Sequence, residues 1–177
     1  TFTCVDTAAP NTITLYVPDI SGNLDSALAT VTVVDSQPPV PVVNNVTVYL
    51  DSSGQALIGP DTIDNGTFDN CVVDSTWLST TTFTCADSGT NNITFFARDL
   101  SGNIASAAAI VTVLDTQPAV VITNNVTVYL DSFGVAVVGP DTVDSASFDN
   151  CAIDSTWLSN TTFTCADTAA PNTITLY

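Results

Sequence analysis

The chain has 177 residues, of which 18 are acidic and only one, Arg98, is basic, and it contains no His. The resulting net charge of -17 excludes nucleic acids and anionic membranes as expected partners, because both bind through clusters of Lys and Arg. Charged residues make up only 11% of the chain and hydrophobic residues 45%, a composition that favours a folded protein over a disordered acidic tail.

An internal repeat dominates the sequence. Residues 44–79 return almost unchanged as residues 124–159, and the opening residues 1–16 return from Thr82 and again as residues 162–177. Repetition at a fixed offset indicates a module that is used many times. We therefore expect a portion of a longer array, divided into the C-terminal part of one module (1–37), a complete module (38–117) and the N-terminal part of the next (118–177).

Short segments rich in Val, Ile, Thr and Phe predict strands in the complete module, and no helical periodicity is visible. The predicted strands are residues 40–43, 46–50, 55–59, 72–77, 81–85, 92–98 and 104–114. Residues 51–54 and 99–103, with Gly and Asn where the chain reverses, predict tight turns. Seven strands in a module of this size predict an all-β fold of tandem immunoglobulin-like β-sandwiches. Prolines between modules favour a semi-rigid rod or fibre.

Five cysteines suggest one disulfide in each module. Cys71 and Cys85 have the same spacing as Cys151 and Cys165, so each of these pairs is expected to close within its module. Cys4 occupies the position of Cys85 and is expected to pair with a cysteine outside the sequence. Regular cysteines indicate an oxidising, extracellular location, whereas a zinc site is disfavoured by the absence of His and of any CxxC motif.

Several motifs carry a family resemblance. The runs F-D-N-C, T-T-F-T-C-A-D, I-T-x-x-x-x-D-x-S-G-N and V-T-V-x-D-x-Q-P resemble the hyalin-repeat-like, immunoglobulin-like modules found in tandem in very large secreted surface proteins. The nearest likeness is to giant cell-surface adhesins of Bacteroidota, and it covers essentially the whole chain. The resemblance implies an extracellular filament, stalk or adhesin with a structural or adhesive role and no catalysis.

Aspartates that recur from module to module are candidate calcium ligands at the joints, because Ca²⁺ binds six to eight oxygens. The candidates are Asp35, Asp51, Asp64, Asp69, Asp99, Asp115, Asp131 and Asp144. Successive strands of the predicted module run in opposite directions, so the number of strands between two turns decides at which end of the module each turn lies. Strand parity in this sense predicts that Asp51 and Asp99 lie near Asp35, and that the loop 59–70 lies near Asp115. The alternative is that these residues only stabilise turns and keep the surface polar.

Mechanical extension, with adhesion as an added role, is the expected function. The alternatives are an array that binds glycans or surfaces, and subunits that assemble by strand exchange. Trp77 and Trp157 are expected in or near the core, and exposed aromatics would favour the binding alternative.

The expected partners are neighbouring modules of the chain or identical subunits of a filament. No membrane insertion is expected, because no apolar run approaches the roughly 20 residues of a membrane span. No enzyme activity is expected, because the aspartates are copied in tandem and His and Lys are absent. Five N-x-S/T sequons are candidate glycosylation sites: Asn45, Asn65, Asn92, Asn125 and Asn160.

Overall fold

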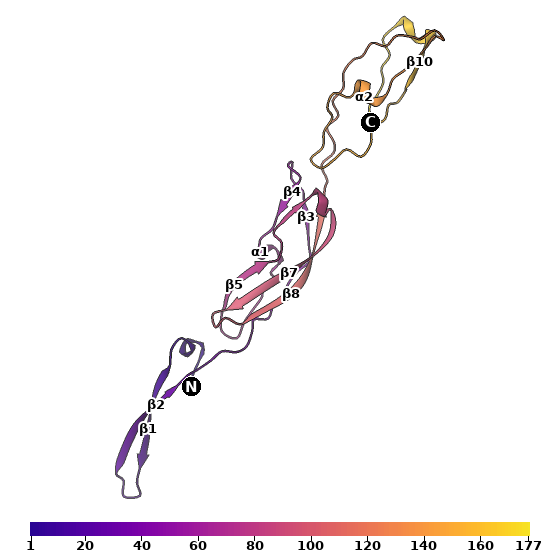
Figure 1. The fold of residues 1–177 in the computed structure, drawn as a ribbon. Helices are drawn as coiled ribbons and strands as arrows, with labels where there is room; N and C mark the ends of the chain where they lie inside the picture. The colour runs from indigo at the N-terminus through magenta and orange to yellow at the C-terminus, as the bar shows by residue number, and fades with distance from the viewer. The chain divides into compact units, whose positions relative to one another are not determined.

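The structure is a computed structural model that describes residues 1–177 (Figure 1). It is mostly β and divides into two units, each interrupted along the chain. The first unit contains Thr1–Thr47, Leu57–Thr82 and Thr90–Thr112. The second unit contains Val48–Ala56, Phe83–Gly89 and Val113–Tyr177.

A β-hairpin opens the first unit. After the short 3₁₀ helix η1 (Cys4–Thr7), strand β1 (Asn11–Pro18) pairs antiparallel with β2 (Leu24–Val31). The Asp19 amide donates to the carbonyl oxygen of Asn23 at 2.8 Å and closes the turn between them. Gly22 has a φ of 85° there, a left-handed conformation that suits glycine because it has no Cβ.

A four-stranded sheet has the order β3-β8-β7-β5, from the strands β3 (Val46–Tyr49), β5 (Val73–Leu78), β7 (Gly89–Asp99) and β8 (Ile104–Leu114). Alternate residues of β7, namely Ile93, Phe95 and Ala97, are buried, as expected for a strand with one face in the core. A separate two-stranded sheet joins β4 (Gln55–Leu57) to β6 (Thr82–Thr84).

These strands confirm six of the seven predicted ones within a few residues at each end. The predicted strand 40–43 is reduced to isolated bridges, in which Val40 pairs with Phe68 and Val43 with Asp64. Pro38, Pro39 and Pro41 cannot donate backbone hydrogen bonds, so a continuous ladder is not possible in this segment.

Two short helical turns follow β4 and β6. The helix α1 (Pro60–Ile63) begins at a proline after Gly59 and buries Ile63 completely, and the 3₁₀ helix η2 (Cys85–Asp87) begins after Thr84. Sequence periodicity did not predict either of them, because a single turn is too short to show a repeat of 3.6 residues. Proline at the first helical position needs no amide partner, which favours the start of α1 there.

The C-terminal residues of the second unit repeat these local structures 80 residues later. They contain β9 (Val135–Val137) paired with β10 (Thr162–Thr164), the helix α2 (Pro140–Val143) and the 3₁₀ helix η3 (Cys165–Ala169). Val120 bridges Phe148 as Val40 bridges Phe68. The apolar cluster of this part contains Val138, Val143, Leu158, Phe163 and Leu176.

No helix of this structure is both long and apolar enough to cross a lipid bilayer.

Candidate functional site

The disulfides differ from those expected. Cys4 is bonded to Cys71, and Cys85 is bonded to Cys151, with Cα atoms 5.5 Å apart in each pair. Cys165 is free and exposed. The predicted pairs Cys71 with Cys85 and Cys151 with Cys165 are therefore wrong, and so is the prediction that the partner of Cys4 lies outside the sequence.

The length of β7 explains why Cys71 does not reach Cys85. Val73, two residues after Cys71, is paired with Asp99 at the end of β7, whereas Cys85 lies four residues before Gly89 at its beginning. A strand of 11 residues spans about 35 Å, and a disulfide requires Cα atoms within about 7 Å. Equal spacing along the sequence thus reflected the repeat and not the pairing.

Each disulfide closes a long loop and crosses a predicted module boundary. The sequence separations are 67 residues for Cys4–Cys71 and 66 residues for Cys85–Cys151. The first bond joins the predicted segment 1–37 to 38–117, and the second joins 38–117 to 118–177. The disulfides therefore connect modules as the sequence divides them, while both cysteines of each bond lie within one unit of the structure.

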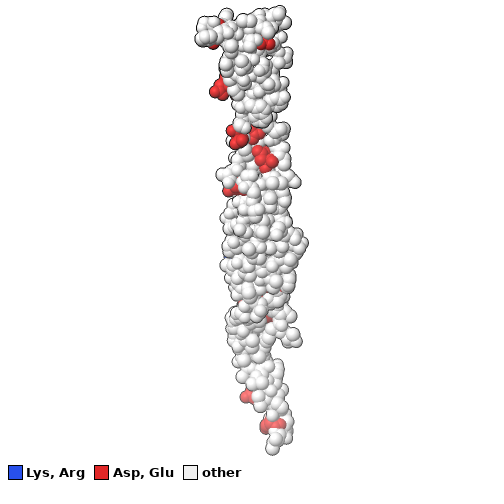
Figure 2. Space-filling view, turned by 90° about the vertical axis from the view of Figure 1, so that its right-hand side faces the viewer, with Lys and Arg blue, Asp and Glu red and all other residues white.

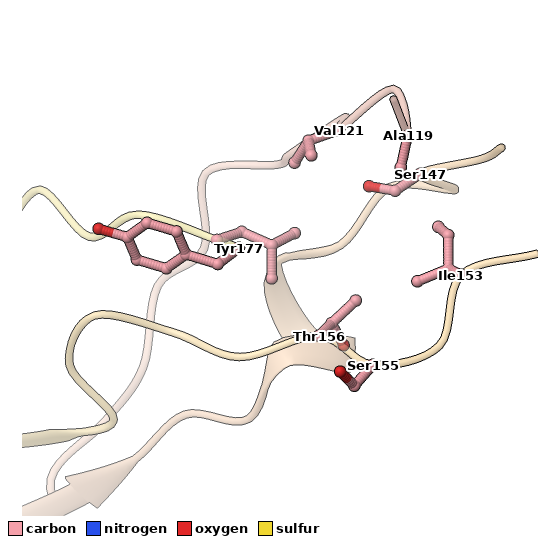
Figure 3. A pocket seen from close by; sticks show the side chains of 8 residues that line it. Ala119, Val121, Ser147, Ile153, Ser155, Thr156 and Tyr177 are labelled. Carbon is pink, nitrogen blue, oxygen red and sulfur yellow. The ribbon is translucent and has the colours of Figure 1, made fainter. Parts of the chain in front are cut away.

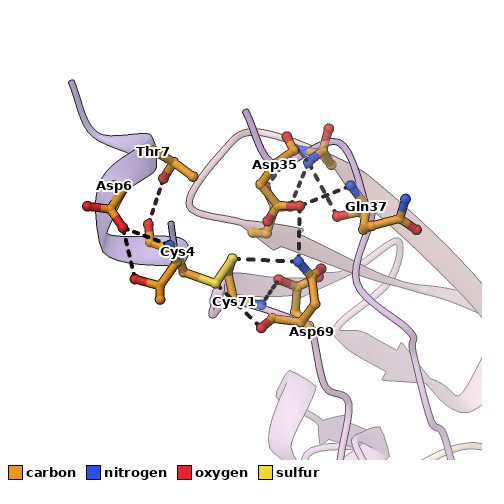
Figure 4. The surroundings of a disulfide bond; sticks show 11 residues. Cys4, Asp6, Thr7, Asp35, Gln37, Asp69 and Cys71 are labelled. Atoms are coloured by element: carbon orange, nitrogen blue, oxygen red, sulfur yellow. Dashed lines mark hydrogen bonds between the residues drawn. A yellow bond between two sulfur atoms is a disulfide. The ribbon is translucent and has the colours of Figure 1, made fainter. Parts of the chain in front are cut away.

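Two carboxylates lie beside Cys71 (Figure 4). One carboxylate oxygen of Asp35, one of Asp69 and the sulfur of Cys71 lie within 4.8 Å of one another. Asp35 is only 9% exposed, and its Oδ1 accepts hydrogen bonds from the amide of Gln37 at 3.1 Å and from the Asn70 side chain at 3.2 Å. Asp69 Oδ2 accepts from the amide of Cys71 at 2.8 Å. Asp35 Oδ2 and Asp69 Oδ1 are buried and have no partner.

The second unit contains the same arrangement at Cys151. Carboxylate oxygens of Asp115 and Asp149 and the sulfur of Cys151 again lie within 4.8 Å of one another. The Asn150 side chain donates to Asp115 Oδ1 at 3.2 Å, as Asn70 donates to Asp35. Asp149 Oδ1 and Asn150 Oδ1 are buried without partners. We refer to the Asp35–Asp69 pair and the Asp115–Asp149 pair as the two carboxylate clusters.

The other candidate calcium ligands serve in turns. Asp51 Oδ1 accepts from the Ser53 hydroxyl at 2.6 Å and from the Gln55 amide at 3.1 Å, and Asp131 Oδ1 accepts from the Val135 amide at 3.0 Å. Hydrogen bonds from the Ser53 hydroxyl and from nearby amides hold the pKa of Asp51 below its usual value. The remaining turn aspartates also accept amide hydrogen bonds locally: Asp64 from Thr67, Asp99 from Asn103 and Asp144 from Ser147.

Asp99 shows how strongly such a turn favours the ionised form. The residue is 1% exposed, and burial by itself raises its pKa. The side chain and amide of Asn103, with the amides of Gly102 and Ser101, outweigh burial and leave the pKa lowered. Asp99 is therefore expected to be ionised at neutral pH.

The predicted grouping of aspartates is only partly correct. The Asn103 side chain donates to the carbonyl oxygen of Asp35 at 3.2 Å, so the turn at Asp99 lies near Asp35 as predicted. Asp51 instead lies near Asp115, because the Leu50 amide donates to the carbonyl oxygen of Leu114 at 2.9 Å and Asn150 contacts both aspartates. The loop 59–70 brings Asp69 to Asp35 and not to Asp115. The prediction failed for two reasons: the first predicted strand is not a strand, and β5 and β6 follow each other in one direction along β7 instead of reversing.

Positive charge is nearly absent from the protein. Arg98 forms a salt bridge with Asp74 at 2.6 Å, and no Lys or Arg is visible on the face in Figure 2, where the acidic side chains form separate groups. Since Arg98 is the only basic side chain, no side chain is left to neutralise either carboxylate cluster.

One small hollow lies in the second unit (Figure 3). Its lining consists of aliphatic, hydroxyl and aromatic side chains: Ala119, Val121, Ser147, Ile153, Ser155, Thr156, Leu176 and Tyr177. None of the predicted metal-binding or disulfide residues lines this hollow.

Two pairs of aromatic rings are stacked near the surface. Trp77 stacks on Phe96 with ring centroids 5.2 Å apart, and Trp157 stacks on Tyr177 at 5.7 Å. Trp77 is 37% exposed and Trp157 is 56% exposed. Trp157 therefore does not lie in the core, contrary to expectation, and Trp77 lies at its edge.

The five sequon asparagines are all exposed. The side chain of Asn45 accepts a hydrogen bond from the amide of Ile110 at 2.8 Å, and the side chain of Asn160 bonds to the backbone of Thr162. The hydrogen bond of Asn45 uses its Oδ1 and not the Nδ2 to which a sugar attaches, whereas the Nδ2 of Asn160 donates to the carbonyl oxygen of Thr162 at 3.2 Å.

Sequence reasoning missed three residues of the site: Asn70, Asn150 and Asp149. The available signal was their place in the repeated F-D-N-C motif, immediately before the cysteine. Comparison of the chain with protein-family models and with curated proteins finds no match.

Proposed function

We propose that this chain is a structural segment of a long extracellular filament, stalk or adhesin. In this proposal tandem immunoglobulin-like β-sandwiches, of the hyalin-repeat-like type that the motifs resemble, transmit force, and adhesion is an added role. The supporting observation is the disulfide pattern, in which each bond joins segments assigned to successive modules.

Force transmission follows from the covalent path through these bonds. Tension that enters at residue 4 can pass from Cys4 directly to Cys71, then along residues 71–85, and from Cys85 directly to Cys151. Residues 5–70 and 86–150 lie inside closed loops and carry no tension along their backbone. A protein built in this way keeps its length under load even when a loop unfolds.

An extracellular location fits the same features. Disulfides persist in oxidising surroundings, and a surface with 18 aspartates and one arginine stays soluble through its net charge. Calcium at the module joints and glycans on the exposed sequons belong to this proposal as further elements. The partners would be neighbouring modules of the same chain or identical subunits in the filament.

Immunogold electron microscopy of intact source cells tests the proposal. Antibodies raised against residues 1–177 are expected to place gold particles at regular intervals along filaments that leave the cell. Preimmune serum is the control. Gold confined to the interior of broken cells would contradict the proposal.

A second candidate function, binding of glycans, is favoured by the exposed aromatic pairs. Sugar rings pack against exposed aromatic faces, and Trp157 with Tyr177 presents two stacked rings of which more than half is exposed. The test is a glycan array probed with the wild-type chain and with the variant Trp157→Ala. Binding that is lost in this variant supports the candidate function, and an array without any bound glycan contradicts it.

A further inference from the structure

We propose that the two carboxylate clusters are calcium sites, one formed by Asp35 and Asp69 and the other by Asp115 and Asp149. The inference deepens the proposed function and rests on it for the supply of calcium, which extracellular fluid provides. It differs from the general expectation of calcium at module joints because it selects two specific pairs and dismisses the turn aspartates.

The first argument is the unsatisfied oxygen atoms. Asp35 is nine-tenths buried and its Oδ2 has no hydrogen-bond donor, and Asp69 Oδ1 in the same cluster has none either. A buried polar atom without a partner costs about 1–3 kcal/mol, and more if it is charged. Such atoms are therefore expected to have a ligand, and two neighbouring carboxylates call for a cation.

The second argument is that the chain itself offers no cation. Its one basic side chain, Arg98, is paired with Asp74. The amide of Asn70 reaches Asp35 Oδ1 but is neutral and brings no positive charge to the cluster. Two carboxylates whose oxygens lie within 4.8 Å repel each other strongly when both are ionised. A positive charge from solution would remove that repulsion.

The third argument is the chemistry of the donors. Calcium binds oxygen ligands at 2.3–2.6 Å, so two of its ligands can lie up to roughly 5 Å apart on opposite sides of the ion. The separation of at most 4.8 Å within each cluster fits that range. Cys71 and Cys151 are disulfide-bonded and provide no thiolate, which disfavours zinc and other soft metals.

The fourth argument is that the cluster occurs twice. Asp115 and Asp149 in the second unit repeat Asp35 and Asp69, including the donation from the neighbouring asparagine and a buried Asp149 Oδ1 without a partner. By contrast, no carboxylate oxygen of Asp51, Asp99 or Asp131 is buried without a partner. The unsatisfied oxygens thus select the clusters from among the candidates.

Bound calcium would hold the segment before β3 against the loop that carries the disulfide. Asp35 precedes the predicted boundary at residue 38, and Asp69 lies two residues before Cys71. Each disulfide would therefore be accompanied by an ionic bond that ties a second segment of chain, at Asp35 or Asp115, to the loop that carries Cys71 or Cys151.

Isothermal titration of the full 177-residue chain tests the inference, with calcium chloride added after removal of metal by a chelator. We expect two sites in the wild-type chain and one site in each of the variants Asp69→Asn and Asp149→Asn. The loss of a charged ligand is expected to weaken the altered site by at least about tenfold. Asp61→Asn, at an exposed position in α1, is the matched control and should retain both sites.

Three results would overturn the inference. The first is no calcium binding at about 10 mM, because the dissociation constant would then exceed the range of extracellular calcium modules. The second is equal binding of magnesium, which indicates screening of surface charge, and the third is two sites in both variants. Peptide mapping under non-reducing conditions checks that each variant retains its disulfides. If one variant misfolds, the other still reports on its own cluster. If the chain binds calcium but no filaments are found on cells, the proposed function is contradicted and the calcium inference stands.

Discussion

Gly54 lies directly against the sulfur of Cys85. A Cβ atom added to Gly54 would come within 2.8 Å of Cys85 Sγ and within 2.6 Å of the carbonyl oxygen of Asn150. The φ of Gly54 is 72°, so the backbone is also in the left-handed region. Gly134 repeats this relationship, with its added Cβ 2.9 Å from Cys165 Sγ. The Cys85–Cys151 disulfide is therefore packed against a position that accepts only glycine.

Replacing Gly54 with alanine is expected to lower the free energy of unfolding by about 3 kcal/mol, from left-handed strain and from overpacking together. Gly102→Ala is the matched control, because Gly102 has a φ of 91° but no atom within 4 Å of its added Cβ. This control should lose only about 1 kcal/mol, from the strain alone. Urea denaturation measures both values, and equal losses in the two variants would disprove the packing role.

The disulfide pairing predicts the effect of cysteine removal. The double variant Cys4→Ala and Cys71→Ala should lose about 4 kcal/mol of stability, since a loop of this length is no longer closed in the unfolded chain. Cys165→Ala, at the free and exposed cysteine, should leave stability unchanged. Non-reducing peptide mapping provides the direct check. Recovery of a peptide that joins Cys71 to Cys85 would contradict the Cys4–Cys71 bond of the structure.

Single-molecule stretching measures the length hidden in the closed loops. Reduction of both disulfides should add about 45 nm to the extended chain, at roughly 3.4 Å for each residue between the bonded cysteines. A variant in which Cys4, Cys71, Cys85 and Cys151 are all alanine should reach the longer length without reductant. An extended length that does not respond to reductant would mean that the loops are open in the native protein.

Acid should destabilise the fold below pH 3.8, the ordinary pKa of an aspartate. The pKa of Asp99 is lowered in the folded state, so its ionised form stabilises the fold above that pH, and the stabilisation is lost as pH falls through the folded pKa. Lowered pKa values of Asp19, Asp51, Asp64, Asp74 and Asp144 add to the effect.

The variant Asp99→Asn tests this pH dependence by urea denaturation between pH 7 and pH 2. It should be less stable than the wild type at pH 7, and the difference should shrink as the wild-type carboxyl becomes protonated. Asp61→Asn removes the same charge at an exposed position and should leave stability at pH 7 unchanged. A difference for Asp99→Asn that stays constant with pH would rule out ionisation of Asp99 as its cause.

Local pattern predicted most of the secondary structure. Alternation in residues 92–98 and 104–114 predicted β7 and β8, and glycine with asparagine predicted the turn at Asp99, because both signals depend on neighbours in sequence. The pairing of cysteines depends on which strand ends meet in space. Equal spacing of Cys71 from Cys85 and of Cys151 from Cys165 carried no information on that point.

The candidate site was predicted in part for the same reason. Asp35, Asp69 and Asp115 were among the predicted calcium ligands, and Asp149 was absent from them. The sequence could not separate these residues from Asp51 or Asp131, because all of them recur with the repeat. Only the hydrogen bonds distinguish a carboxylate that caps its own turn from one that has a buried oxygen left without a donor.

The disulfide loops also decide what proteolysis can do. A single cut anywhere in residues 5–70 or 86–150 opens a loop, yet the two fragments remain joined through the intact disulfide. Arg98, the only residue after which a trypsin-like protease can cleave, lies inside the second loop. Such a protease could therefore nick this protein at its one available site without dividing it.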